Sequence, residues 1–178
     1  SVIKNTALAA LVVLLAFAIA DVQGCFSITI DTKNMFAFTR FGLFFNILAI
    51  ASTLLYVFLS GDDIVDVGNY AAEYFALIFF ILCGVSILSS FNNLLIMFIG
   101  VEIMSIPLYI LTGAAKKNLK SNEAGLKYFL MGSFTTGLML MGIALLYGAS
   151  GNFGIEALIK ESGTASGNAQ KLTPILEV

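Results

Sequence analysis

Long runs of hydrophobic residues, separated by short polar stretches, dominate this chain. The middle of the sequence shows the pattern most clearly. Residues 74–91 are uncharged, a pair of asparagines follows, residues 94–115 hold one charged residue, and residues 128–149 are again uncharged. About 20 apolar residues in a helix span the roughly 30 Å hydrocarbon core of a bilayer. These runs therefore predict transmembrane helices.

Two further apolar runs precede these three, so we predict an all-α, multi-pass transmembrane helical bundle of about five spans. The predicted spans cover residues 2–20, 36–59, 73–91, 94–115 and 122–148. Together they form one transmembrane domain over residues 1–155, with a Gly- and Ser-rich tail outside the membrane over residues 156–178. Ser121 is the predicted N-cap of the last helix. The alternation of apolar and polar residues from Cys25 to Asp31 predicts a short strand outside the bilayer.

Composition supports the membrane class and excludes several functions. The chain is 59% hydrophobic and only 11% charged, far from the average of soluble domains. Its net charge of −2 offers no basic surface for nucleic acid. With no histidine and two cysteines, we expect no metal site, haem or iron–sulfur cluster on this chain. Proton chemistry must then fall to carboxylates, lysines and water.

Glu102 is the first candidate functional residue, because it is the single charge within residues 94–115. An ionised carboxylate at the centre of a transmembrane helix costs at least about 2.5–3.5 kcal/mol, so it is expected to face protein or water. Pro107 removes a backbone hydrogen bond and predicts a kink beside the acid that can host water. Glu102 is then a proton site whose affinity depends on an approaching cation. The alternative is a neutral acid that only joins helices.

Lys127 is the second candidate, and two interpretations remain open for it. Glu123 precedes it by four residues, in the orientation that favours an ion pair on a helix surface, which would make the lysine structural. The other interpretation is a lysine that carries protons. By helix rise, Glu102 lies roughly 20 Å below the end of its predicted helix and Lys127 roughly 7–8 Å below the start of the next. Direct contact between the two is therefore not expected.

Three segments carry a family resemblance: FIGVEIMSIPLYILTG over residues 98–113, EAGLKYFLMGSF over 123–134 and GIALLYGASG over 142–151. They resemble the N subunit of bacterial respiratory complex I, NADH-quinone oxidoreductase, closely over 73–155 and more loosely over 1–72. The resemblance implies an antiporter-like membrane subunit that couples quinone reduction elsewhere in the complex to proton transfer, with Glu102 and Lys127 in the proton path.

The resemblance also implies partners and a location. NADH, FMN, iron–sulfur clusters and quinone would belong to partner subunits, and this chain would be a non-redox part of the enzyme. Its neighbours would be the lipid bilayer and other membrane subunits, especially antiporter-like ones, in the bacterial inner membrane. The lysine-rich link over residues 114–125 is predicted to be cytoplasmic, since positive charges concentrate on that side.

The sequence departs from the family in one respect. N subunits resemble antiporter subunits with further helices, and the main lysine partner of the matching glutamate lies in a later, broken helix that this chain lacks. We therefore expect the chain to match an N-terminal part of such a subunit. Two alternatives remain: a subunit of a multisubunit cation/proton antiporter or membrane-bound hydrogenase, and a structural membrane scaffold.

Overall fold

The computed structural model describes residues 2–24, 35–66 and 71–160, without the side chains of residues 60–66. These residues form five helices: α1 (Val2–Val22), α2 (Arg40–Asp66), α3 (Ala71–Ser89), α4 (Leu94–Thr112) and α5 (Leu119–Ser150). All five are long and apolar enough to cross a membrane, which confirms the predicted all-α bundle of five spans. The predicted strand over residues 25–31 and most of the predicted tail, residues 161–178, lie outside the described part of the chain.

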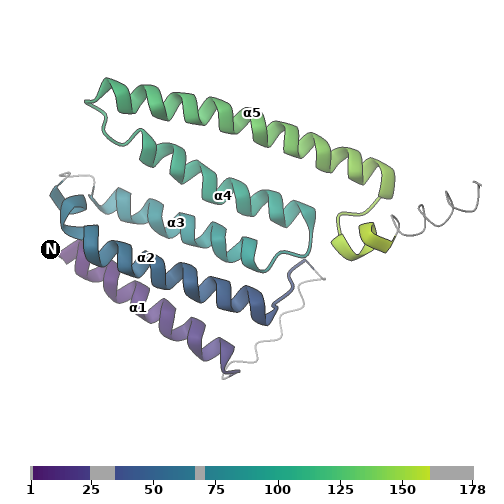
Figure 1. The fold of residues 1–178 in the computed structure, drawn as a ribbon, viewed down its shortest axis with the longest axis horizontal. Helices are drawn as coiled ribbons and strands as arrows, with labels where there is room; N and C mark the ends of the chain where they lie inside the picture. The colour runs from purple at the N-terminus through teal and green to yellow at the C-terminus, as the bar shows by residue number, and fades with distance from the viewer. Residues whose placement is uncertain (1, 25–34, 67–70, 161–178) are drawn as a thin grey trace, which may run out of the picture.

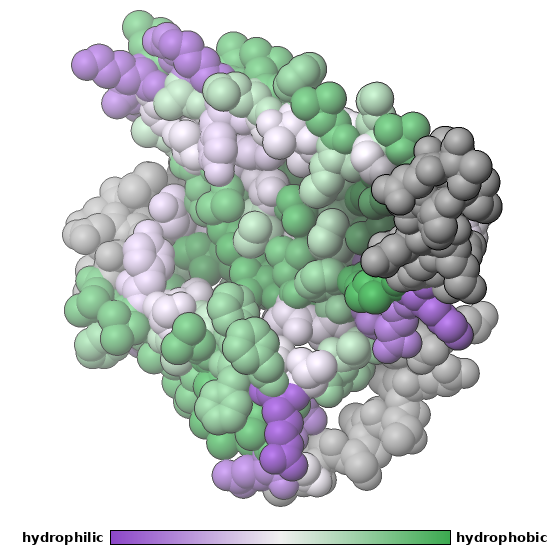
Figure 2. Space-filling view, turned by 45° about the vertical axis from the view of Figure 1, so that its right-hand side comes forward, coloured by the Kyte–Doolittle hydropathy of each residue, from purple (hydrophilic) through white to green (hydrophobic). Residues whose placement is uncertain are grey.

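Consecutive helices run antiparallel, and α4 lies between α3 and α5 (Figure 1). The start of α1, the end of α2 and the link between α4 and α5 stand at one end of the bundle. The turn between α3 and α4 stands at the other. In the face shown by Figure 2, hydrophilic residues gather at the margins, while the surface between them is mostly hydrophobic. This distribution suits a bundle whose flanks meet lipid.

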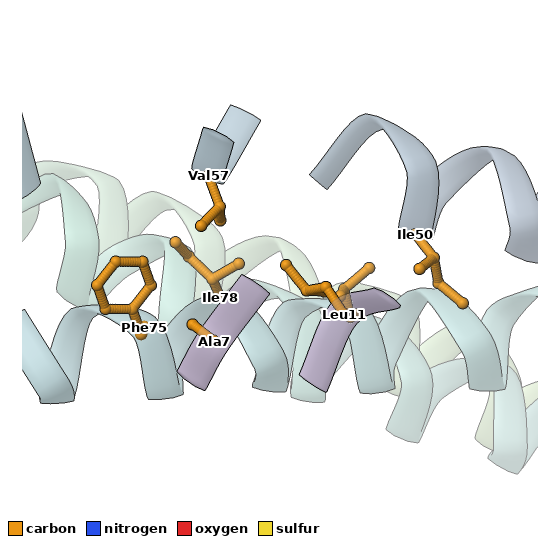
Figure 3. Close-up of a cluster of buried hydrophobic side chains, with 7 residues drawn as sticks. Ala7, Leu11, Ile50, Val57, Phe75 and Ile78 are labelled. Atoms are coloured by element: carbon orange, nitrogen blue, oxygen red, sulfur yellow. The ribbon is translucent and has the colours of Figure 1, made fainter. Parts of the chain in front are cut away.

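The hydrophobic core joins the first three helices. Side chains from all three converge in the close-up of Figure 3, where Leu11 and Val57 are almost completely buried. The buried members of this cluster are Ala7, Leu11, Ile50, Val57, Phe75, Ile78 and Leu82. α4 and α5 contribute none of them. Among the larger helix–helix contacts of the described residues, α5 packs only against α4.

Glycines bring α3 and α4 into close contact. A Cβ atom on Gly84 of α3 would lie 2.7 Å from the backbone nitrogen of Met104 in α4. On α4, a Cβ atom on Gly100 would lie 2.9 Å from the Leu88 side chain. Transmembrane helices associate largely through van der Waals packing, and small residues allow their backbones to approach. The two glycines therefore fix how α4 sits against α3.

The turn between α3 and α4 is held by backbone hydrogen bonds from two distant segments. The amide of Ala37 donates to the Ser90 carbonyl at 2.8 Å, and that of Asn92 donates to the Met35 carbonyl at 3.0 Å. On the other side, the Leu94 amide donates to the Phe153 carbonyl at 3.0 Å. The entry to α2 and the exit from α5 are thus attached to one turn.

The start of α5 differs from the prediction. The helix begins at Leu119, three residues before the predicted boundary, and its N-cap is Asn118 rather than Ser121. The Asn118 side chain accepts a hydrogen bond from the Lys120 amide at 3.0 Å, whereas the Ser121 hydroxyl donates to the Thr112 carbonyl at 2.8 Å. Both residue types are good N-caps. Ser121 is instead used to join α5 to the end of α4.

The close contact at Gly84 gives a stability prediction. Gly84→Ala places a methyl group against the α4 backbone, and we expect overpacking to lower the free energy of unfolding by about 1–3 kcal/mol. Gly142→Ala is the matched control, because nothing lies within 4 Å of the added methyl group in this chain. It should leave stability unchanged or raise it by up to about 1 kcal/mol. Denaturation in detergent micelles, followed by circular dichroism, measures both, and equal stability of the two variants contradicts the packing argument.

Candidate functional site

A pair of glycines sets the register between α4 and α5. A Cβ atom on Gly125 of α5 would lie 2.9 Å from the Cα atom of Gly113, which follows the last residue of α4. The hydrogen bond from Ser121 to the Thr112 carbonyl lies one turn nearer the link. The two helices are antiparallel. A residue that lies a given number of positions after Gly125 in α5 is therefore level with the residue that lies the same number of positions before Gly113 in α4.

One turn deeper than Gly113, Tyr109 of α4 packs against α5. Its hydroxyl oxygen lies so close to Gly132 that it would overlap a Cβ atom at that position. Its ring meets Tyr128 edge to face, with centroids 4.8 Å apart at an interplanar angle of 87°, and Phe129 at 6.0 Å. The stripe of α4 that holds Tyr109 and Gly113 therefore faces α5.

Glu102 lies on the same stripe of α4. It precedes Tyr109 by seven residues, almost two full helical turns, so the two side chains project from the same face. It occupies the middle of α4 and is half-buried. Within the part of the chain that the structure describes, its carboxylate has no hydrogen bond and no ion pair. The predicted intramembrane acid thus projects from the side of α4 that Tyr109 turns to α5, beside the exposed Leu95 and Ile99.

The face of α5 opposite Glu102 offers hydroxyl groups but no cation. Counted from the glycine pair, Glu102 is level with Thr136, which is half-buried. The Thr136 hydroxyl donates to the Ser133 carbonyl at 3.2 Å, so its oxygen keeps a free lone pair. α5 carries no lysine or arginine after Lys127. The partner cation of Glu102, if it comes from protein, is not on this stretch of α5.

Pro107 lies inside α4, and the helix continues on both sides of it. The proline is buried and has no N–H group, so the carbonyl of Ile103 loses the hydrogen bond that a residue at 107 would donate. Ile103 is the residue next to Glu102. The backbone hydrogen bond that Pro107 was predicted to remove is therefore the one to the Ile103 carbonyl.

Lys127 lies away from this interface. Its position on the helix is 200° from Gly125, so it projects from the opposite side of α5. Its ammonium group forms an ion pair with Glu123, and the two side chains are 71% and 63% exposed. By the same register it is level with Leu111, nine residues or about 13 Å along the axis from the level of Glu102. The structure brings Lys127 to Glu123 and does not bring it to Glu102.

A second polar feature lies at the opposite end of the bundle. A cavity of about 500 Å³ opens between the end of α1 and the facing parts of α2 and α3, with mostly apolar walls and Asp21 and Cys83 in its lining. Within it the Ser86 hydroxyl donates to the Asn46 side-chain oxygen at 2.9 Å. Among the described residues, no group of three histidine, cysteine or acidic side chains is arranged to hold a metal ion.

Sequence reasoning found the acid but missed the tyrosine beside it. Tyr109 looked like one aromatic residue among many in an apolar run. Only its contact with Gly132, on the next helix, distinguishes it. Gly125 and Gly132 are seven residues apart on one face of the helix, and this spacing indicates that another helix packs closely there. The spacing does not indicate which residue of the other helix contacts each glycine.

The comparisons with known proteins agree with the fold. Residues 91–176 match the family described as NADH:quinone oxidoreductase/Mrp antiporter, transmembrane. The solved respiratory complex I from Thermus thermophilus with bound aureothin contains a chain of similar structure. The TM-score is 0.64 with 28% sequence identity, over 86% of this chain and 33% of that one.

Curated relatives give the same family. A protein of Flavobacterium psychrophilum named NADH-quinone oxidoreductase subunit N is 42% identical over 71% of this chain. Subunit N of Cytophaga hutchinsonii is 43% identical over the same share, and subunit N 1 of Chloroherpeton thalassium 36% over 87%. This chain spans between 28% and 33% of the length of these relatives. It belongs to the antiporter-like membrane subunit family of which the N subunit of NADH-quinone oxidoreductase is a member.

Proposed function

We propose that this chain is part of a proton-translocating membrane subunit of NADH:quinone oxidoreductase. The observation that carries the proposal is Glu102, a half-buried carboxylate in the middle of α4 that faces α5 without a partner in the described residues. Intramembrane acids of this kind are rare and mark ion or proton pathways. The relatives named NADH-quinone oxidoreductase subunit N support the choice of complex.

The chemistry of such a site follows from its surroundings. In a low-dielectric interface a lone carboxylate holds a proton, and the approach of a positive charge favours its release. Glu102 would exchange a proton with the path as a charged group, moved by the working complex, approaches and withdraws. The carbonyl of Ile103, freed by Pro107, and the Thr136 oxygen can hold water beside it.

Electron transfer would take place on other subunits. NADH, FMN, iron–sulfur clusters and quinone are assigned to those partners, because this chain has no histidine and only two cysteines. The chain would contribute the proton path as a non-redox part of the enzyme. Its neighbours would be other membrane subunits, among them antiporter-like ones, in the bacterial inner membrane.

A cation/proton antiporter subunit is the second candidate function, because the matching family includes the Mrp antiporters. The same carboxylate can bind Na⁺ as well as H⁺, since hard cations prefer oxygen ligands. Sodium-dependent transport by vesicles that contain the purified assembly, without any NADH oxidation, would favour this function. NADH-driven proton pumping without sodium favours the first.

Lys127 is assigned a part in the same proton path, at its end near the link. Its ammonium group pairs with Glu123 on the helix surface, and residues 128–150 after it are long enough by themselves to cross the hydrocarbon core. Lys127 would then stand at the membrane boundary, where a lysine can collect or deliver protons. Lys116 and Lys117 in the link and Lys120 in the first turn of α5 add positive charge at this end, which we assign to the cytoplasm.

We expect Glu102→Gln to reduce the number of protons pumped per electron sharply, because glutamine keeps the shape of the side chain and cannot take up a proton. Glu102→Asp should reduce it less. Proton uptake and NADH oxidation are measured together in vesicles that contain the assembled complex, after its subunit content is verified. An unchanged ratio in Glu102→Gln removes the basis of the proposed function.

The pair at the start of α5 gives a second test. If Lys127 only anchors the helix, Glu123→Gln and Lys127→Met should have equally small effects, because each removes one surface pair worth about 0.2–0.5 kcal/mol. We expect Lys127→Met to impair pumping well beyond Glu123→Gln, and Lys127→Arg to impair it too, since arginine does not deprotonate. Equal effects of Lys127→Met and Glu123→Gln would show that the lysine is structural.

The orientation is tested with Ala115→Cys in the link and Glu156→Cys after α5, both exposed, in a variant whose Cys25 and Cys83 are replaced by alanine. In intact spheroplasts, a membrane-impermeant maleimide should label residue 156 and should reach residue 115 only after the membrane is opened. Labelling of residue 115 alone in intact spheroplasts would reverse the orientation.

A further inference from the structure

Two polar groups on the stripe of α4 that faces α5 lack partners in the described part of the chain. One is the Glu102 carboxylate, and the other is the hydroxyl group of Tyr109, whose contacts are aromatic or steric. Both residues are half-buried. A tyrosine hydroxyl between packed helices normally finds a hydrogen-bond partner, and where protein offers none an accessible hydroxyl takes water. Water beside both groups is therefore expected.

The two groups are arranged in line along the helix interface. Their Cα atoms are seven residues, or about 10 Å, apart along α4. Helical side chains lean toward the N-terminus of their helix, so the Tyr109 ring extends from its own Cα atom toward the level of Glu102. Its hydroxyl stands at Gly132, seven residues deeper in α5 than the Gly113 contact at Gly125. The tyrosine thus covers part of the distance from the lysine-bearing end to the acid.

We propose that the Tyr109 hydroxyl relays protons between the link end of the α4–α5 hairpin and Glu102. A water molecule on the link side gives a proton to the phenol oxygen, and the phenol gives its own proton to a water molecule on the Glu102 side, which passes one to the carboxylate. The tyrosine is neutral before and after, and its O–H bond then turns back. This inference rests on the proposed proton function of Glu102.

Gly132 is what leaves room for this hydroxyl between the two helices. Any Cβ atom at 132 would overlap the phenol group, so α5 presents bare backbone at the one position that the hydroxyl reaches. Tyr128 and Phe129 hold the ring from its sides by edge-to-face contacts. These aromatic contacts involve only the ring, and removal of the oxygen atom leaves them in place.

The test compares Tyr109→Phe with Tyr128→Phe in the assembled complex. Each removes one hydroxyl group from the same aromatic cluster, but only the Tyr109 hydroxyl lies in the helix interface at Gly132. We expect Tyr109→Phe to lower the pumping rate by more than half while uncoupled NADH oxidation stays normal. The ratio of pumping rates in H₂O and D₂O should rise as well, because proton transfer becomes limiting. Tyr128→Phe should match the parent protein in both.

Glu102→Gln in the same vesicles separates the two proposals. Impaired Glu102→Gln with a normal Tyr109→Phe overturns the relay and leaves the proposed function intact. Equal losses in Tyr109→Phe and Tyr128→Phe also overturn the relay, because the hydroxyl at Gly132 then has no special role. A silent Glu102→Gln removes the proposed function and the relay together. A lower rate in Tyr109→Phe without a change in the isotope ratio shows a structural effect and counts against the relay.

Discussion

The free energy of a carboxylate in hydrocarbon is the constraint on which the arrangement of α4 and α5 depends. An exposed charge at the depth of Glu102 would cost at least about 2.5–3.5 kcal/mol, so α4 must turn that face toward another helix. The structure meets the constraint by placing α5 there. Because α4 meets α3 on one side and α5 on the other, its lipid contact is limited to the edges between them.

Close packing of α4 against its neighbours is achieved by glycine at the contacts and not by large buried side chains. The hydrophobic core lies among α1, α2 and α3, whereas α4 is held by Gly84 against α3 and by Gly125 and Gly132 against α5. Dispersion forces fall off steeply with distance, so an added methyl group at these positions separates whole helices. Gly84, Gly125 and Gly132 are therefore positions of α3 and α5 with little tolerance for added volume.

Hydropathy was sufficient to predict the five spans, and a lone charge in an apolar run singled out Glu102 as a candidate. Both signals are local in sequence. The N-cap at Asn118 was missed because Asn118 and Ser121 are equally good caps, and tertiary contact with Thr112 decided between them. The position of Tyr109 depends on the register of two helices, which no local pattern specifies. The roles of Glu102 and Lys127 stay predictions until the variants are measured.

The turn between α3 and α4 gives the hairpin a fixed end and a free one. Backbone hydrogen bonds tie the turn before α4 to residues 35 and 37 and tie Leu94, the first residue of α4, to Phe153, whereas in the described part of the chain the hydrogen bond that leaves its last turn runs to the start of α5. A helix fixed at one end behaves as a lever. A force applied to the link would swing Tyr109 through a wider arc than Glu102, so the distance between their side-chain oxygens would change while the acid itself stays nearly in place.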